Sequence, residues 1–195
     1  MVKLIAIEGI DGSGKTTLAR ALHEKLSRKY KVVLTSEPFT QDILNLLEKY
    51  GWKDQVLLAL LFSADREIHV RWMMEQDAEI IITDRYYYST IAYQGVRVQE
   101  EWLISLNSVF PRPNLTILLD VPLDVAWERL SRKRDSMNFE EKLRSLGEVR
   151  ERYLRLAKKE GFHVLDGTRP LEELVTASLD LILGSFSTSL RNLSI

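Results

Sequence analysis

The stretch GIDGSGKTT at residues 9–17 constrains the fold more than any other part of this sequence. It follows the apolar run at 4–7, and its spacing of a glycine, four residues and then Gly-Lys-Thr fits the phosphate-binding pattern G-x-x-x-x-G-K-[ST]. Glycines let consecutive backbone N–H groups turn toward phosphate oxygens, and a following helix adds the positive end of its dipole. A stripe at helical spacing follows, formed by Leu18, Ala21, Leu22 and Leu26. The sequence therefore predicts a short strand, a phosphate-binding loop and a helix.

The side chains of this loop indicate what it binds. Lys15 is expected to reach the β- and γ-phosphates of a nucleoside triphosphate, and the Thr16 hydroxyl is expected to ligate Mg²⁺. The glycines read G-x-x-G-x-G, which is not the dinucleotide-binding order G-x-G-x-x-G. The loop alone fits ATPases, GTPases and small kinases equally well.

Composition narrows the class of protein. The chain has 195 residues, 45% of them hydrophobic and 28% charged, which predicts a single domain over 1–195. A net charge of −1 argues against a general polyanion binder, and the absence of cysteine excludes thiol catalysis and thiolate metal sites. No signal-peptide pattern opens the chain, and no apolar run approaches the roughly 18–20 residues of a membrane span. A soluble, cytoplasmic protein that binds neither nucleic acid nor membrane is expected.

Short apolar runs alternate with longer helical patterns along the chain. Alternating strands and helices predict an α/β fold, here a three-layer α/β/α arrangement with a five-stranded parallel sheet. In such sheets ligands bind beyond the carboxyl ends of the strands. The tail at 185–195 lacks strong periodicity and is expected to be loosely held. The expected strands are 4–7, 32–35, 80–83, 115–119 and 163–165, and the expected helices lie near 14–29, 40–50, 54–77, 122–134, 138–160 and 170–183.

The stretch RLSRKR at 129–134 carries four cationic residues in six. Arg129, Arg132 and Lys133 would share one helix face. Phosphoryl transfer needs positive charge around the moving group, and a cationic segment closing over a nucleotide would supply it and exclude water. We expect a short helical lid at about 129–141. On charge alone, a solvated helix end explains the same residues equally well.

The stretch DRYYYSTIAYQG at 84–95 follows a predicted buried strand, where a second substrate would lie. Asp84 is expected to order Mg²⁺ through water, and Arg85 is expected to clamp the phosphate of an acceptor as a bidentate donor. Four tyrosines fall within this stretch. We expect about two of them in the core and Tyr93 in the wall of a pocket.

These motifs together resemble the thymidylate kinases, a family of nucleoside monophosphate kinases. IAIEGIDGSGKTT resembles the opening of the family, LFSADR at 61–66 its base-reading helix, and DRYYYSTIAYQG its signature D-R-[YH]-x-x-S-x-x-A-Y-Q-G. LLDVP at 118–122 and VRERY at 149–153 follow in the family's order. The resemblance covers nearly the full chain. It implies a P-loop kinase fold and transfer of a phosphoryl group from ATP, with Mg²⁺, to dTMP.

The resemblance also implies roles for individual residues. Phe62 would stack on thymine and Arg66 would donate to its O4. Tyr93 would pack at C2′ of the sugar, and Asp11 would face the 3′-hydroxyl. The residues implied for ATP are Gly9, Ile10, Asp11, Gly12, Ser13, Gly14, Lys15, Thr16, Thr17 and Arg129. Those implied for dTMP are Asp11, Glu37, Phe39, Phe62, Arg66, Arg85, Thr90, Tyr93, Gln94 and Tyr153. Catalysis would fall to Lys15, Asp11, Arg85, Arg132 and Arg134, and the metal to Thr16 and Asp84.

The sequence departs from the family after the second strand and in the lid, where it reads DSMNFE at 135–140 instead of the usual D-R-F-E. Where relatives often read R-E-P-G-G-T, this chain reads SEPFT at 36–40, so an arginine is absent and Phe39 is expected to narrow the pocket. Some members carry an arginine in the phosphate loop where this chain has Gly12, and their lids are poor in cations. The basic residues 132–134 would therefore bring the lid charge from the other side, as in the bacterial-type arrangement.

Rival functions remain open at this point. A kinase that also accepts dUMP is the nearest alternative, because a single methyl group gives only roughly 1–3 kcal/mol of discrimination. A deoxynucleoside kinase would need a carboxylate base, for which Glu37 is the candidate. A nucleotide-dependent switch module is more distant. The histidines His23, His69 and His163 gain no role in any of these mechanisms. The long apolar helix at 54–77 favours a homodimer, as is common in the family.

Overall fold

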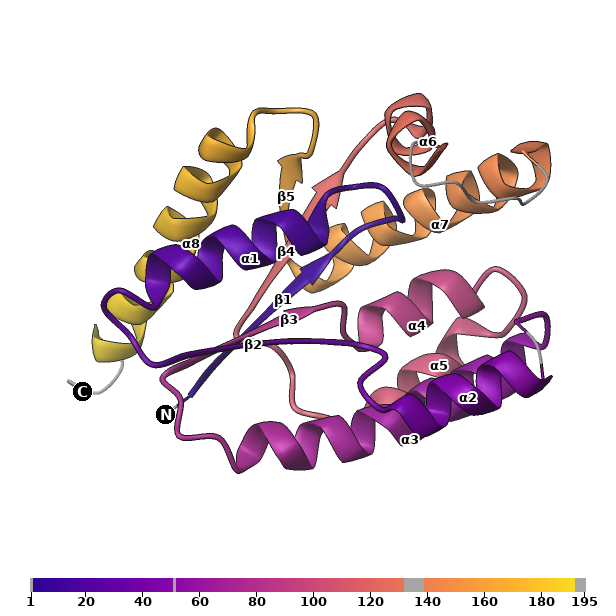
Figure 1. Ribbon diagram of the computed structural model, residues 1–195, viewed down its shortest axis with the longest axis horizontal. Coiled ribbons are helices and arrows are strands. Elements are labelled where there is room, and N and C mark those ends of the chain that lie inside the picture. Colours follow the sequence, from indigo (N-terminus) through magenta and orange to yellow (C-terminus); the bar gives the residue numbers. More distant parts are fainter. Residues whose placement is uncertain (1, 51, 132–138, 192–195) are drawn as a thin grey trace.

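Five parallel strands form one sheet in the order β2-β3-β1-β4-β5 (Figure 1). The computed structural model describes residues 2–50, 52–131 and 139–191. All five predicted strands are present, and each extends one or two residues beyond its predicted bounds. The strands are β1 (Lys3–Glu8), β2 (Val32–Ser36), β3 (Ile80–Asp84), β4 (Leu115–Asp120) and β5 (His163–Asp166).

The helices largely follow the predicted pattern. They are α1 (Lys15–Leu26), α2 (Gln41–Tyr50), α3 (Gln55–Met74), α4 (Tyr87–Gln94), α5 (Glu100–Asn107), α6 (Leu123–Ser131), α7 (Phe139–Glu160) and α8 (Leu171–Arg191). Two of them, α4 and α5, were not predicted: each has 8 residues, too few to show a clear periodicity. Helix α8 continues to Arg191, so it runs through most of the tail expected to be loose.

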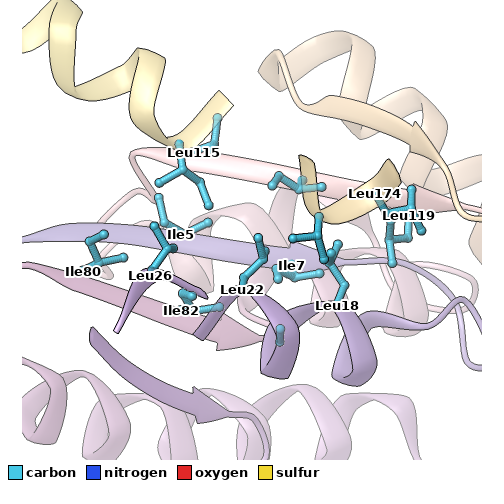
Figure 2. Packing of buried hydrophobic residues seen from close by; sticks show 14 residues of the cluster. Ile5, Ile7, Leu18, Leu22, Leu26, Ile80, Ile82, Leu115, Leu119 and Leu174 are labelled. Atoms are coloured by element: carbon cyan, nitrogen blue, oxygen red, sulfur yellow. The ribbon is translucent and has the colours of Figure 1, made fainter. Parts of the chain in front are cut away.

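The two faces of the sheet are covered by different helices because successive strand residues point to opposite sides. On one side Ile5, Ile7 and Ile82 pack against α1 and α8, and Figure 2 shows these side chains gathered with Leu18 and Leu22 of α1. On the other side Ala6 and Ile81 pack against α3, while Leu118 joins a cluster built largely from α4 and α7. The predicted three-layer α/β/α fold is confirmed.

Parallel pairing brings the carboxyl ends of the strands to one edge of the sheet. Residue Ile7 is level with Asp84 of β3, and Asp120 is level with Asp166 of β5. The phosphate loop, the start of α4 and the loop after β5 therefore meet above this edge. Within the described residues, no helix is long and apolar enough to cross a membrane.

Candidate active site

The phosphate loop ends at Gly14, whose left-handed backbone (φ 99°) precedes the first turn of α1. No side chain caps this helix, so its first N–H groups face the space above the loop. A second glycine is required by a close approach, since a Cβ on Gly12 would lie 2.5 Å from the carbonyl oxygen of Ala126. The loop therefore has the open helix end and the glycine geometry of an anion-binding site.

Lys15 lies at the base of this loop and is only 6% exposed. Its Nζ donates to the carbonyl oxygen of Ile10 at 2.9 Å. Burial and, after it, the positive charge of Arg85 lower the pKa of Lys15 to about 7, although the charges of Asp11, Asp84 and Glu8 act in the opposite direction. A bound triphosphate would bring negative charge to this ammonium group and restore its proton.

Proton uptake on ATP binding follows from this pKa. Above pH 7 the free protein holds Lys15 largely neutral, whereas the complex holds it charged, so affinity for ATP should fall as the pH rises from 7 to 9. Isothermal titration calorimetry at pH 8, in buffers of different ionisation enthalpy, should show uptake approaching one proton. Heats that do not depend on the buffer would contradict this account.

Thr16 and Asp84, the two residues predicted to hold the metal, lie next to each other in the structure. The Thr16 hydroxyl donates to Asp84 Oδ2 at 2.5 Å, across the edge of the sheet between α1 and β3. The other carboxylate oxygen, Oδ1, is buried and has no hydrogen-bond partner among the described residues. A hard cation accepts hydroxyl and carboxylate oxygens, so this pair fits Mg²⁺. No group of three or more histidine, cysteine or acidic side chains in the described parts of the chain is placed to hold a metal.

Arg85 follows β3 in a left-handed backbone conformation (φ 72°), which is uncommon for a residue with a Cβ. The Thr83 hydroxyl donates to the carbonyl oxygen of Arg85 at 2.6 Å. The guanidinium pairs with Asp11, donates to Ser89 Oγ at 3.1 Å and lies 5.2 Å from the ring centroid of Tyr93. The structure thus brings the predicted phosphate clamp beside the phosphate loop.

One pocket of about 370 Å³ opens next to these groups. Of the ten residues predicted to bind the acceptor, eight line it: Asp11, Glu37, Phe62, Arg66, Arg85, Thr90, Tyr93 and Gln94. Tyr93 lies in its wall as expected, and its hydroxyl accepts the backbone N–H of Asp11 at 2.9 Å. Tyr86 and Tyr88 are buried in the core, which agrees with the expectation of about two core tyrosines.

Arg66 lines the pocket, and its guanidinium forms an ion pair with Glu37. It is 1% exposed, and Glu37 accepts from its Nε at 2.9 Å and from its Nη2 at 2.6 Å. Asn107 accepts from Nη1 at 2.6 Å, and Thr90 accepts from Nη2 at 3.2 Å. These contacts occupy four of its five N–H groups, leaving one on Nη1 for a ligand. The guanidinium of Arg66 is therefore held in place, and Glu37 Oε2 is its main partner.

His69 completes this buried group, although no role was predicted for it. Its Nδ1 lies 3.1 Å from Glu37 Oε1, and its Nε2 lies 2.8 Å from the Thr35 hydroxyl. A carboxylate only accepts, so Nδ1 donates to Glu37. Both ring nitrogens of His69 are bonded to neighbouring side chains, which agrees with the structural role expected for it.

Phe39 does not narrow the pocket, contrary to the prediction. Its ring stacks on His69 at 4.6 Å between centroids and packs against Trp72 at 5.1 Å. Asp65 fixes the backbone there by accepting from the N–H groups of Phe39 and Thr40 at 2.6 and 2.7 Å. The ring therefore covers the buried histidine and does not reach the pocket.

Tyr153 also lies outside the pocket lining, behind the wall rather than in it. It is 1% exposed, and its ring meets that of Tyr93 edge-on with centroids 6.3 Å apart. In the structure Tyr153 packs behind Tyr93 and supports the pocket wall, and its predicted contact with the acceptor stays a prediction.

Arg129 bridges two loops instead of reaching outward. Its Nη1 donates to the carbonyl oxygens of Gly12 and Ser13 at 3.3 and 3.2 Å, and its Nη2 donates to that of Gly167 at 3.0 Å. It thereby ties the phosphate loop to the DGTRP segment after β5. The lid residues Arg132, Lys133 and Arg134 lie outside the described residues.

Sequence reasoning missed several residues of the site. Trp52 and Gln55 line the pocket before and at the start of α3, and the Trp52 ring lies 6.3 Å from that of Phe62. Gln94 donates to Gln55 at 3.3 Å. The one signal in the sequence for this part of the pocket was a tryptophan just before the long apolar helix predicted at 54–77. Glu8 and Asn107 gave none, because their partners are distant in sequence.

Comparison with known proteins agrees with this geometry. A family model described as Thymidylate kinase matches residues 7–177. A probable thymidylate kinase of Metallosphaera sedula is 64% identical over 188 residues, covering 96% of each chain. Probable thymidylate kinase 1 of Saccharolobus solfataricus is 54% identical over 93% of this chain and 97% of its own. A probable thymidylate kinase of Sulfurisphaera tokodaii is 50% identical over 93% of this chain and 96% of its own. The chain belongs to the thymidylate kinase family.

Proposed function

We propose that this chain is an ATP-dependent dTMP kinase, which transfers the γ-phosphoryl group of ATP to dTMP and yields ADP and dTDP. One observation supports this most directly. A single pocket is lined by Asp11 of the phosphate loop, by Arg85 next to it, and by Phe62 and Arg66 on α3. A phosphate clamp and a base reader therefore share one cavity, as a nucleoside monophosphate requires.

The chemistry needs positioning and charge rather than a general base. A phosphate oxygen of dTMP, already ionised near pH 7, attacks the γ-phosphorus, and the bond to the β,γ-bridging oxygen breaks. Lys15 and the open end of α1 would balance charge on the triphosphate, while Arg85 would hold the acceptor phosphate in line. Thr16, together with Asp84 through water, would hold Mg²⁺, which would supply positive charge to the triphosphate. The cations at 132–134 would add charge from the lid.

The far end of the pocket would select the nucleoside. Phe62 would stack on the base, and the remaining Nη1 hydrogen of Arg66 would donate to O4, with Thr90 and Gln94 nearby. A cytosine base presents an amino group at that position, which would face a donor and be rejected. Tyr93 would crowd C2′ and disfavour a ribose.

Acceptor selectivity tests this function. ADP formation from Mg·ATP should be fast with dTMP, slower with dUMP and close to background with dGMP, AMP and CMP. The Tyr93→Ala variant should accept the ribonucleotide of thymine better relative to dTMP than the wild type does. Rapid turnover with a purine monophosphate, and slow turnover with dTMP, would overturn the assignment of the base end.

We also propose a cytoplasmic homodimer formed through α3. Val56, Leu60 and Ile68 are 48%, 46% and 48% exposed, and with Ala64 they recur every four residues along one helix face. An apolar stripe of this kind is typical of an interaction surface. A second copy placing the same stripe against it would form an isologous interface.

A charged residue in this stripe should separate the subunits. Light scattering on the wild type should give roughly twice the chain mass of 22.6 kDa, and Leu60→Glu should give the single-chain mass. Arg20→Glu, on the exposed face of α1, is the matched control and should leave the dimer intact. A wild type that is monomeric at micromolar concentration would exclude the proposal.

A further inference from the structure

Glu8 is the last residue of β1 and is 0% exposed, yet the mechanism above uses it nowhere. Its carboxylate is fully satisfied. Oε1 accepts the backbone N–H of Tyr86 at 2.9 Å, and Oε2 accepts the hydroxyls of Ser89 and Tyr153 at 2.7 and 2.8 Å. Burying a carboxylate is costly even with such partners, so a purely apolar residue would suit the core better. Two of the partners of Glu8 hold Arg85: Tyr86 follows it in the chain, and Ser89 contacts its guanidinium.

The backbone of Arg85 is held from both sides by the end of β1. Its own N–H donates to the carbonyl oxygen of Ile7 at 3.0 Å, and the next N–H, of Tyr86, donates to the Glu8 carboxylate. These two bonds bracket a residue in the left-handed region at φ 72°. A conformation that L residues rarely adopt persists only where surrounding contacts determine it.

The guanidinium of Arg85 is reached through Ser89. A serine hydroxyl has one hydrogen, and here it donates that hydrogen to Glu8. The lone pairs of Ser89 Oγ are then turned to Arg85 Nη1, which lies 3.1 Å away. Glu8 thus holds the backbone immediately after Arg85 through the N–H of Tyr86. It directs the side chain of Arg85 through the hydroxyl of Ser89.

We propose that Glu8 is a positioning residue for phosphoryl transfer, which holds Arg85 in the orientation that grips the acceptor phosphate. The inference rests on the proposed function, because it takes Arg85 to be the phosphate clamp. Tyr153 belongs to the same unit, since its hydroxyl lies 2.8 Å from both Glu8 Oε2 and Ser89 Oγ. Glu8 and Tyr153 do not line the pocket, so both would affect the binding of the acceptor only through the position of Arg85.

Glu8→Gln is the sharpest test because it keeps the shape of the side chain. An amide offers one oxygen and one NH₂ group, so either the Tyr86 N–H or the two hydroxyls would face a donor. We expect kcat/KM for dTMP to fall roughly tenfold to a hundredfold, as for a misplaced catalytic group. KM for ATP should stay within about twofold of the wild type, a difference that a general loss of packing would not produce.

Tyr153→Phe provides a milder variant in case Glu8→Gln does not fold. It removes one hydrogen bond to Glu8 and leaves the ring that packs against Tyr93. It should raise KM for dTMP by about two- to fivefold, as expected for one lost hydrogen bond, without changing KM for ATP. Glu100→Gln is the matched control, because Glu100 also pairs with α7, through Arg152 and Lys159, but does not line the pocket. Its acceptor kinetics should match the wild type.

The outcomes separate this inference from the proposed function. Wild-type protein without dTMP-dependent ADP formation would refute the function itself, whatever Glu8 does. Normal wild-type turnover, together with variants that change KM for ATP and dTMP equally or leave both unchanged, would overturn the positioning role alone. Selective loss for dTMP in Glu8→Gln or Tyr153→Phe, with Glu100→Gln unaffected, would establish it.

Discussion

Lys15→Ala is expected to lower kcat for phosphoryl transfer by roughly 10²- to 10³-fold or more, the cost of removing a preorganised charge from a transition state. Lys15 is the one side chain of the phosphate loop that combines a positive charge with near-complete burial. Charge in a water-excluded site acts more strongly than in bulk water. The backbone of the loop would still bind phosphate, so ATP should bind more weakly but not be lost.

Coupled measurement of ADP release, with dTMP saturating, tests this expectation. Circular dichroism should show an intact fold, because alanine leaves no buried charge behind. Lys25→Ala is the matched control, since Lys25 lies on the same helix, α1, but is exposed. Activity near that of the wild type in Lys15→Ala would contradict the assignment of residues 9–17 as the catalytic phosphate loop.

Arg66→Ala is expected to do two things at once: weaken dTMP binding and destabilise the fold. The first follows from the lost donor to O4, with an expected cost of roughly 1–3 kcal/mol. The second follows from Glu37, whose side chain is 5% exposed and would lose its cationic partner. Removing one member of a buried ion pair typically costs about 3–5 kcal/mol in the free energy of unfolding. Affinity for ATP should not change.

Urea unfolding and separate calorimetric titrations of dTMP and ATP distinguish these effects. The double variant Arg66→Ala, Glu37→Gln removes the stranded charge, so it should recover part of the stability but none of the dTMP affinity. Equal losses of dTMP and ATP affinity would show that Arg66 is only structural. An unfolding free energy unchanged from the wild type would contradict the account of Glu37.

The parts of this molecule that were predictable from sequence are those set by local patterns. Strands of four to six residues rich in Ile, Val and Leu, and glycines at fixed spacing before Lys15, carry their signal within a short window. The family resemblance predicted ten residues that contact the acceptor, and eight of these residues line one pocket of the structure. Short helices such as α4 and α5 lacked that local signal.

The residues that escaped prediction depend on partners far away in the chain. Glu8 is bonded to residues 78 and 145 positions later, and Asn107 is bonded to Arg66, 41 positions earlier. No pattern within a short stretch of sequence predicts hydrogen bonds between residues so far apart. The prediction that Phe39 narrows the pocket was wrong for the same reason, because Asp65 and His69 of α3 hold its backbone and ring away from the pocket.

The central claim is that the acceptor is a nucleotide held by its own phosphate. The most direct measurement compares ADP formation from Mg·ATP with dTMP, with thymidine and with no acceptor. Fast turnover with dTMP, and background rates with thymidine or no acceptor, is the predicted result, because Arg85 lies beside the phosphate loop, where it would receive the acceptor phosphate. Turnover with thymidine that equals or exceeds turnover with dTMP would contradict it, as would slow ADP release that is the same in all three mixtures.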